Sequence, residues 1–406
     1  MNAGATVATE ALLARQPIYE ANGRTFAYEL LYRSSSINEA RFQDASAATA
    51  QVINHSFTEF GLDRIVGRAP AFINIPREFI MNGLCMSLPP ERVVLEILED
   101  TVVDAALLNA VKDLSRHGYK LALDDYIFQE HFDVLLPLCN YIKVDIRGME
   151  RNEIAGRMPA LRGVAKLLAE KVETIEEFDF CRSLGFDYFQ GFFFARPHIL
   201  SQKKAPMNRV AIFRLVAKLH AANVSTHDVE NIISEDLSLS YKVLRFVNSA
   251  FVGLQKQIES IGHAVRLVGL ERIRLLASLI MMSSVEQKPL ELMKMSLIRA
   301  KMCESLSMYR NFKNKELFFT VGLFSTLDAF LDCSMPEALQ LLPLSDEVCE
   351  AILNWKGMAG RILESVVLYE ECRWDEFGRP APDLIVLRDA YLGSIEWTEQ
   401  LLTELQ

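Results

Sequence analysis

The sequence lacks closely spaced cysteines, long apolar runs and an N-terminal signal-peptide pattern. Its seven cysteines are dispersed and odd in number, which indicates reduced thiols rather than a disulfide framework. No apolar run reaches about 18 residues, the length that a membrane-spanning helix needs. We therefore expect a soluble cytoplasmic protein that is not associated with a membrane.

The sequence also lacks an excess of basic residues. The formal net charge is -10, and a protein that coats DNA or RNA needs a basic face instead. A nucleic-acid polymer is therefore not an expected partner. A small anionic ligand that is held through metal ions stays compatible with this charge.

The length of 406 residues predicts two domains. In the first 200 residues, short β-rich runs alternate with amphipathic helical stretches. Such alternation predicts parallel strands with crossover helices, and about seven strands favour a closed barrel over an open sheet. The expected strands are 25–32, 71–75, 92–98, 120–125, 141–145, 165–172 and 188–195.

The alternation of strand and helix patterns ends at a stretch that contains Pro197, Pro206 and a lysine pair, which we interpret as a linker. Beyond it strand signals vanish, and apolar residues recur at helical spacing, with an interruption at Gly269. The expected fold class is therefore an α/β protein, a compact TIM-like (β/α) barrel over 1–202, followed by an all-α domain over 203–406.

Polar and charged residues recur where the expected strands end. Any one of them alone is more typical of a solvated strand end or a surface ion pair. Carboxylates that converge on one barrel mouth would repel each other unless cations neutralised them. Oxygen ligands favour Mg²⁺ or Mn²⁺, and two such ions are suited to splitting a phosphodiester, with a lysine to orient the water. The residues at these ends are Glu29, Arg33, Asn74, Glu96, Glu99, Asp124, Asp125, Lys143, Asp145, Glu170, Glu173 and Gln190.

These motifs resemble the EAL family of cyclic-di-GMP phosphodiesterases. The resemblance runs from "RQPIYEANGRTFAYELLYR" (15–33) to "DYFQGFFFARP" (187–197) and covers the first half of the chain. It implies a TIM-like barrel that cuts cyclic-di-GMP to linear pGpG with two Mg²⁺ or Mn²⁺ ions.

The resemblance also implies a role for each matching residue. Lys143, Glu170 and Glu29 would be catalytic, and Glu99 would anchor the loop that follows the next strand. The ligand-binding positions would be Gln16, Arg33 and Gln190. The metal ligands would be Glu29, Asn74, Glu96, Asp124, Asp125 and Glu170.

The sequence departs from the EAL pattern at several positions. The signature itself reads Glu-Leu-Leu, and Lys171 stands where glycine is usual. The loop "YIFQEHF" (126–132) replaces a Gly/Ser-rich segment that couples metal binding, substrate binding and dimerisation in the family. Short spacings between Glu29 and Asn74 and between Lys143 and Glu170 also predict that some crossover helices are trimmed or missing.

The second half resembles the HDOD domain, a helical relative of the HD-type phosphohydrolases, over roughly 203–395. Ser325 and Thr326 stand where the metal-binding His-Asp pair would be. The histidines of this half are isolated and are expected to be exposed or satisfied in the core (His220, His227, His263). Asn248 is expected to make a structural hydrogen bond.

Three functions are compatible with these patterns. The complete acidic set with Lys143 favours an active cyclic-di-GMP phosphodiesterase that the HDOD domain regulates. The altered loop favours a catalytically inactive cyclic-di-GMP receptor or a protein-interaction scaffold. A metal-dependent enzyme acting on another phosphodiester is the third. An unidentified signalling protein would bind the HDOD domain, as in a two-domain bacterial signalling architecture, and a homodimer is possible.

Overall fold

In this computed structural model the described residues are 11–34, 61–191, 207–221, 223–248, 258, 260–285, 288–377 and 383–405. The chain forms two compact units. The first contains 1–193 together with 369–388, and the second contains 194–368 together with 389–406. The division expected at 202/203 placed 369–388 in the second domain, whereas the structure groups these residues with the first unit.

The first unit is a closed eight-stranded barrel in which every strand pairs with its neighbours in chain order. The α/β barrel expected from the sequence is thus confirmed. The strands from β2 to β8 are parallel, but β1 runs antiparallel to both β2 and β8. The strands are β1 (Ala11–Glu20), β2 (Thr25–Ser34), β3 (Ala71–Ile75), β4 (Val93–Ile97), β5 (Lys120–Leu123), β6 (Tyr141–Asp145), β7 (Lys166–Glu170) and β8 (Tyr188–Gln190).

Strand β1 was not among the strands expected from the sequence. It forms a hairpin with β2 through a tight turn, in which Gly23 has a φ of 82° and the Glu20 carbonyl accepts hydrogen bonds from the Gly23 amide. A hairpin reverses the chain without a crossover helix, so β1 enters the barrel antiparallel to its neighbours. The seven strands expected from the sequence are all parallel, and β1 is an additional, antiparallel strand that the sequence did not predict.

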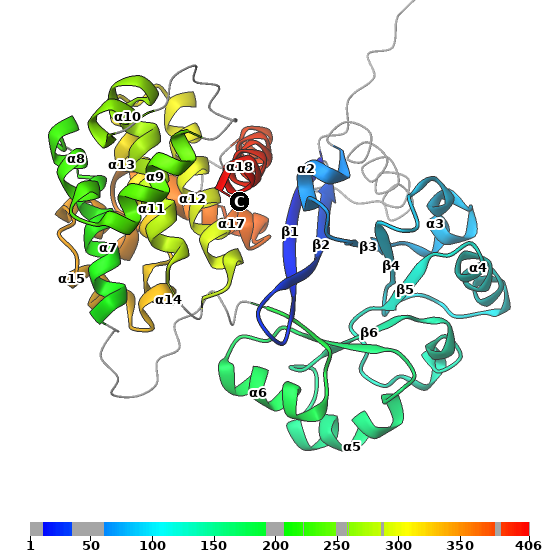
Figure 1. Ribbon diagram of the computed structural model, residues 1–406. Coiled ribbons are helices and arrows are strands. Elements are labelled where there is room, and N and C mark those ends of the chain that lie inside the picture. The colour runs from blue at the N-terminus through cyan, green and yellow to red at the C-terminus, as the bar shows by residue number, and fades with distance from the viewer. Residues whose placement is uncertain are drawn as a thin grey trace, which may run out of the picture. The chain divides into compact units, whose positions relative to one another are not determined.

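Helices cover the outside of the parallel strands (Figure 1). The best example is α4, which buries Leu107, Val111 and Leu114 on one face and begins where Asp104 accepts a hydrogen bond from the Leu107 amide at 2.8 Å. The others are α2 (Leu62–Val66), α3 (Arg77–Met81), α4 (Ala105–Arg116), α5 (Arg151–Leu161) and α6 (Ile175–Leu184).

One crossover has no α-helix. Between β5 and β6 all residues are described, and only the short 3₁₀ turns η3 (Glu130–Phe132) and η4 (Leu136–Leu138) occur there. Trimming was expected from the short spacing between Lys143 and Glu170, but that crossover keeps a helix, α5 (Arg151–Leu161); the crossover without a helix is the one between β5 and β6. The loop expected to be unusual therefore connects the two strands directly.

Apolar side chains fill the lower layer of the barrel interior. Phe26 and Tyr188 close this layer, with ring centroids 4.1 Å apart in a stacked arrangement. Each strand from β1 to β7 contributes one residue to the layer, as in other barrels whose interior is packed rather than open. The buried members are Ile18, Ala27, Phe72, Val94, Ala122, Tyr141 and Leu168.

The second unit is helical wherever the structure describes it, as expected. The predicted interruption at Gly269 is confirmed, because this residue has a φ of 95° and separates α10 from α11. The helices are α7 (Met207–Leu219), α8 (Thr226–Ser234), α9 (Leu237–Val247), α10 (Ile261–Val268), α11 (Leu270–Ser283), α12 (Leu290–Tyr309), α13 (Lys315–Phe324), α14 (Leu327–Leu331), α15 (Met335–Gln340) and α16 (Asp346–Asn354), with α17 (Gly357–Glu370) and α18 (Leu384–Leu405) divided between the units.

The segment 369–388 is held to the barrel by a fully buried tyrosine. The Tyr369 hydroxyl donates a hydrogen bond to the Leu13 carbonyl of β1 at 2.9 Å. The Trp374 indole, from η7 (Trp374–Glu376), donates to the Tyr369 carbonyl at 3.0 Å. A buried polar group of this kind needs its partner, so these contacts explain why the segment belongs to the first unit.

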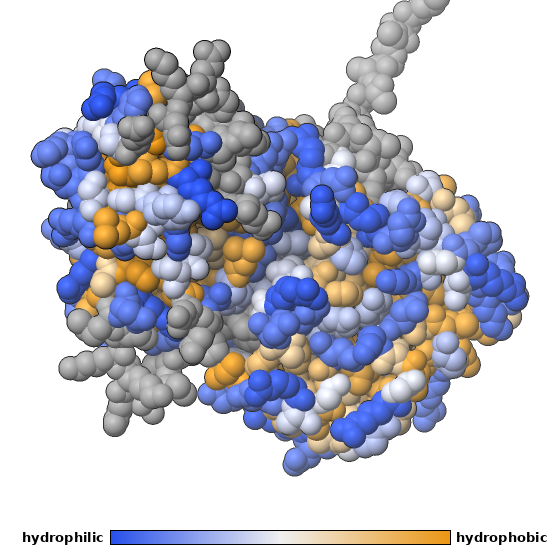
Figure 2. Space-filling view, viewed as in Figure 1, coloured by the Kyte–Doolittle hydropathy of each residue, from blue (hydrophilic) through white to orange (hydrophobic). Residues whose placement is uncertain are grey.

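Hydrophobic and hydrophilic side chains are interspersed over the visible face of each unit (Figure 2). Among the described residues, no helix combines the length and the apolar character that crossing a bilayer requires.

Candidate active site at the barrel mouth

A polar layer lies directly above the apolar layer of the barrel. Side chains two residues apart on a strand point to the same face, so a residue two positions beyond each apolar member also points into the barrel. Phe72 is followed in this way by Asn74, and Val94 by Glu96. The remaining pairs on parallel strands are Ala27 and Glu29, Ala122 and Asp124, Tyr141 and Lys143, Leu168 and Glu170, and Tyr188 and Gln190.

Strand β1 contributes to the same layer in the opposite sense. Because β1 is antiparallel, the polar residue precedes the apolar one, and Gln16 lies two residues before Ile18. Gln16 is directly opposite Glu29 in the β1–β2 register. The structure thus brings residues from all eight strands to one mouth of the barrel.

Lys143 is at the centre of this mouth and is fully buried. Its Nζ lies 2.6 Å from both Glu96 Oε1 and Asp124 Oδ1, 3.0 Å from Glu170 Oε1 and 3.2 Å from Glu29 Oε2. One ammonium group therefore faces four carboxylates. A buried charge needs this kind of pairing to be tolerated.

Amide side chains fix the carboxylate of Glu29. Asn74 Nδ2 donates to Glu29 Oε1 at 3.0 Å, and Gln190 Nε2 donates to Glu29 Oε2 at 2.6 Å. The Gln190 amide also donates to Gln16 Oε1 at 3.1 Å. Glu29 is consequently held by a group from the neighbouring strand β3 and by one from β8, which lies beyond β1 in the barrel.

The pKa values of the groups in the mouth are shifted, because four carboxylates lie around a single ammonium group. Burial raises the pKa of Glu170 to about 8, although the Lys143 charge opposes this shift. Burial and the neighbouring Glu29 raise the pKa of Glu96 well above its ordinary value. For Lys143, burial acts to lower the pKa, but the attraction of the four carboxylates outweighs it and raises the pKa.

Several buried oxygen atoms of the mouth have no hydrogen-bond partner in the part of the chain that the structure describes. They include Asn74 Oδ1, Glu96 Oε2 and Glu170 Oε2. Buried polar atoms are nearly always satisfied, so each of these indicates a missing partner. Carboxylate and amide oxygens are the ligands of Mg²⁺ and Mn²⁺, and this donor set therefore fits a divalent ion.

The same carboxylates are drawn toward Lys143 rather than arranged around an ion. Among the described residues, no group of three or more His, Cys, Asp or Glu side chains has the geometry of a metal site. The reason is that Lys143 Nζ takes one oxygen each of Glu96, Asp124 and Glu170. The unpartnered oxygens belong to the same side chains or to their neighbours.

The two adjacent aspartates have different partners. Both follow the end of β5, and Asp125 has a φ of 41°, which turns its side chain away from that of Asp124. Asp124 faces Lys143, whereas Asp125 pairs with Lys171, whose Nζ lies 3.0 Å from Asp125 Oδ1 and 2.7 Å from Asp145 Oδ2. Sequence reasoning assigned no role to Lys171 or Asp145; the lysine in place of the usual glycine was the available signal.

The loop 126–132 is fixed by its own side chains. The Tyr126 amide donates to the Lys143 carbonyl at 2.8 Å, and the Tyr126 hydroxyl donates to Asp133 at 3.1 Å. Phe128 packs against Tyr126 with ring centroids 5.0 Å apart, and Arg157 lies 5.2 Å from the centre of the Phe128 ring. Bulky residues thus replace glycines with packing contacts, and the loop is attached to the strand that carries Lys143.

The polar layer does not account for two predicted site residues. Glu99 is exposed beyond the end of β4, and its expected role as the anchor of the loop 126–132 stays a prediction. Arg33 lies near the end of β2, opposite Leu12, but its side chain is outside the described residues.

Comparison with known proteins decides the family. A family model described as the HDOD domain matches residues 205–347. The cyclic di-GMP phosphodiesterase CdgJ of Vibrio cholerae is 35% identical over 369 residues, which are 89% of this chain and 85% of CdgJ. The chain belongs to the EAL–HDOD family. An uncharacterized protein of Bacillus subtilis, YuxH, is 34% identical over 96% of this chain and 98% of its own length.

Solved EAL structures resemble only part of this EAL–HDOD chain. BlrP1 of Klebsiella pneumoniae, in a complex with calcium and cyclic-di-GMP, has 25% identity and a TM-score of 0.39, covering 48% of this chain and 58% of its own. An EAL domain protein of Listeria monocytogenes has 23% identity and a TM-score of 0.37, covering 46% of this chain and 87% of its own. At these TM-scores the likeness supports no conclusion about ligands or metals.

The HDOD region of this family member contains Ser325 and Thr326, which the resemblance places where an HD hydrolase has its metal-binding pair. Thr326 Oγ1 lies 2.5 Å from Ser296 Oγ, and Ser325 Oγ donates to the Gly322 carbonyl at 2.7 Å. Hydroxyls that are satisfied in this way are poor ligands for a hydrolytic metal ion.

Other polar residues of the HDOD region are structural. Asn248 accepts a hydrogen bond from the Ile258 amide at 2.6 Å and donates to the Ile258 carbonyl at 2.7 Å, which confirms the expected structural role. His220 is partly buried with its Nε2 2.9 Å from Ser278 Oγ, and desolvation lowers its pKa to about 3. His220 is therefore neutral at physiological pH.

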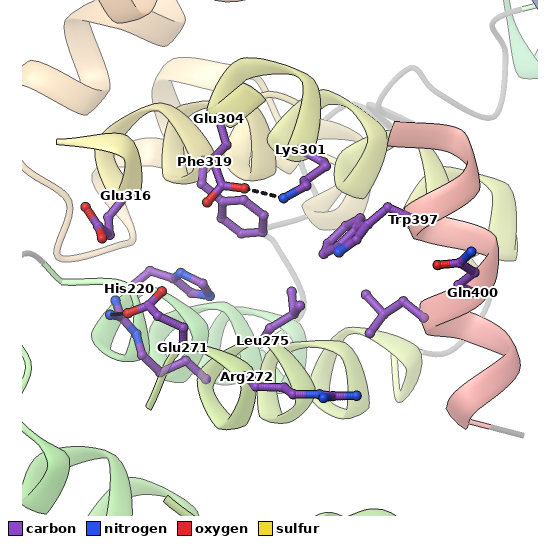
Figure 3. A pocket seen from close by; sticks show the side chains of 12 residues that line it. His220, Glu271, Arg272, Leu275, Lys301, Glu304, Glu316, Phe319, Trp397 and Gln400 are labelled. Carbon is purple, nitrogen blue, oxygen red and sulfur yellow. Dashed lines mark hydrogen bonds and ion pairs between the residues drawn. The ribbon is translucent and has the colours of Figure 1, made fainter. Parts of the chain in front are cut away.

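The helical unit also contains a cavity of about 310 Å³ that is separate from these hydroxyls. Figure 3 shows Phe319, Trp397 and Leu275 turned toward the space between the helices, with Lys301 joined to Glu304. Lys301 Nζ lies 2.7 Å from Glu304 and 5.3 Å from the centre of the Trp397 ring. Charges of both signs are thus already paired or stacked at the edge of this cavity.

Proposed function

We propose that the chain hydrolyses cyclic-di-GMP to linear pGpG and that its HDOD domain regulates this reaction. One observation carries the proposal: residues from every barrel strand place four carboxylates, two glutamines and an asparagine around the buried Lys143. The relative that carries the name cyclic di-GMP phosphodiesterase supports the substrate, because it matches nearly the whole chain.

The proposed reaction adds water to phosphorus and breaks one of the two phosphodiester bonds of the ring. The proton of the water leaves with the 3′ oxygen, and the new end is a 5′-phosphate. The ammonium of Lys143 neutralises negative charge beside the phosphate, and Glu170, whose pKa is about 8, can hold or release a proton near neutral pH.

The site residues proposed to hold Mg²⁺ or Mn²⁺ are those with unpartnered buried oxygens, Asn74, Glu96 and Glu170, together with Glu29 and Asp124. A bound ion would supply a water of lowered pKa and would stabilise the charge that develops on phosphorus. Asn74 and Gln190 orient Glu29, and the apolar layer beneath excludes water from the lower barrel.

A receptor that binds cyclic-di-GMP without cutting it is the second candidate. The observation that favours it is the ion pair between Lys171 and Asp125, because Asp125 is a metal ligand in the resembled family. An assay of cyclic-di-GMP hydrolysis distinguishes the phosphodiesterase from the receptor directly. Homodimer formation and the identity of the HDOD partner stay predictions of the resemblance.

The decisive experiment is incubation of the purified chain with cyclic-di-GMP and Mg²⁺ or Mn²⁺, with separation of the nucleotides by chromatography. We expect pGpG from the wild type and a loss of about a thousandfold in rate for Glu29→Gln, because that change removes a charged group from the mouth. Glu91→Gln is the matched control, since Glu91 is exposed and precedes β4 at the end away from the polar layer, and it should keep its rate. No pGpG from the wild type would favour the receptor.

Metal affinity should depend on pH through Glu170. Its carboxyl must lose a proton to bind a divalent ion, and its pKa in the metal-free protein is about 8. We expect Mn²⁺ affinity to fall about tenfold for each pH unit below that value, and to level off above it. Titration with Mn²⁺ between about pH 6 and pH 9 measures this; a Glu170→Gln variant should lose much of the slope, and a flat wild-type profile would contradict the assignment.

A further inference from the structure

A second lysine sits among the acidic residues of the barrel mouth. Lys171 Nζ contacts both carboxylate oxygens of Asp125, at 3.0 Å and 3.2 Å, and Asp145 Oδ2 at 2.7 Å. The side chain is about half-buried, with 48% of its surface exposed. Lys171 therefore bridges the ends of β5 and β6 from the end of β7.

The two lysines divide the acidic residues into two neighbouring groups. Asp124 and Glu170 contact Lys143, and the residue that follows each of them, Asp125 and Lys171, forms the second group with Asp145. Both Asp125 and Lys171 have positive φ angles, 41° and 58°, which residues with side chains adopt rarely. The backbone thus turns at both positions, and the two side chains meet.

We propose that the ammonium group of Lys171 takes the place of one of the two divalent ions, so that this chain binds a single ion at its barrel mouth. The proposal rests on the proposed function only for the location of the site. It concerns how many ions the mouth holds, which can be measured without any turnover.

The distribution of satisfied and unsatisfied oxygens supports one ion. Both oxygens of Asp125 are already bonded to Lys171. At the mouth, the buried side-chain oxygens without partners among the described residues are on Asn74, Glu96, Glu170 and Gln190, which all belong to the group around Lys143. Among the described residues, ligands are therefore left over in one group only.

A tethered ammonium group differs from a metal ion in what it can do. It contributes one positive charge and donates hydrogen bonds, so it can hold a phosphate oxygen, but it is not a Lewis acid that lowers the pKa of a bound water. Lys171 would accordingly hold the phosphate, while the remaining ion binds on the Lys143 side of the mouth.

The test counts Mn²⁺ ions per chain by equilibrium dialysis and elemental analysis, on the whole chain at about pH 8, because carboxyl ligands must lose their protons to bind a divalent ion. The informative variants are Lys171→Gly and Lys171→Asn, since glycine and asparagine both tolerate a positive φ. Lys171→Arg keeps the charge. Lys166→Ala is the matched control, because Lys166 lies on the same strand and pairs with Asp187 at 2.6 Å.

We expect one ion in the wild type, in Lys171→Arg and in Lys166→Ala, and two ions in Lys171→Gly and Lys171→Asn. Two ions in the wild type would overturn the inference even if the protein hydrolyses cyclic-di-GMP. A rise from one to two in the glycine variant would support it even if no pGpG forms. No bound ion in any variant would overturn both this inference and the proposed metal site.

Discussion

Replacing Lys143 by methionine should destabilise the barrel more than any other single change in the mouth. The substitution keeps the length of the side chain but leaves four buried carboxylates without their common cation. Removing one partner of a buried ion pair typically costs about 3–5 kcal/mol of unfolding free energy. We expect a loss of this size for the metal-free protein at about pH 8, measured by hydrogen exchange of barrel peptides under increasing denaturant.

The loss should diminish in two circumstances. Lower pH protonates Glu96 and Glu170, whose pKa values are raised mainly by burial, and this removes part of the repulsion. Added Mn²⁺ supplies a cation and should stabilise the variant more than the wild type. Lys166→Met is the control, because Lys166 is largely exposed. Equal effects of the two substitutions would show that Lys143 is not the electrostatic centre of the mouth.

Gly191→Ala should disturb both stability and activity. Gly191 has a φ of 144°, and a Cβ added there would lie 2.0 Å from the Val172 carbonyl oxygen. The Val172 amide donates to the Gln190 carbonyl at 3.0 Å, so relief of the clash would separate β8 from the segment that follows β7. We expect the barrel to lose about 3 kcal/mol and Gln190 to lose its contact with Glu29.

A second glycine distinguishes the clash from backbone strain. Gly163 also has a positive φ, 80°, but nothing lies within 4 Å of a Cβ built there. Gly163→Ala should therefore cost only about 1 kcal/mol, through strain alone. The measurements are thermal unfolding and the rate of cyclic-di-GMP turnover for both variants. A Gly191→Ala protein as stable as Gly163→Ala would contradict the close approach of Val172.

The polar layer was largely predictable because strand periodicity is local. Side chains two residues apart share a face of a strand. The segments "YIK" (141–143) and "LAE" (168–170) therefore each predict an apolar and a charged side chain on the same face. Once the strands are known to be parallel, such charged positions must converge at one end of the barrel. The resemblance to the EAL motifs then identified Glu29, Asn74, Glu96, Asp124, Lys143, Glu170, Gln190 and Gln16 together.

The partners of these residues could not be predicted in the same way, because pairing depends on distances between strands. Adjacent positions in the sequence gave Asp124 and Asp125 the same expected role, but the positive φ of Asp125 directs it to Lys171. The contacts within the loop 126–132, between Tyr126 and Phe128 and between Tyr126 and Asp133, likewise depend on its folded course and not on any local periodicity.

By itself, the sequence determined the α/β barrel, the helical second half, the inner face of each parallel strand and the acidic character of the mouth, since all of these follow from periodicity and residue chemistry within short segments. Only the tertiary structure decided that β1 is antiparallel, that Tyr369 brings residues 369–388 back to the barrel, and that two lysines share the carboxylates. These features join residues that are far apart in the chain, and their energies depend on burial and on distances that no local pattern specifies.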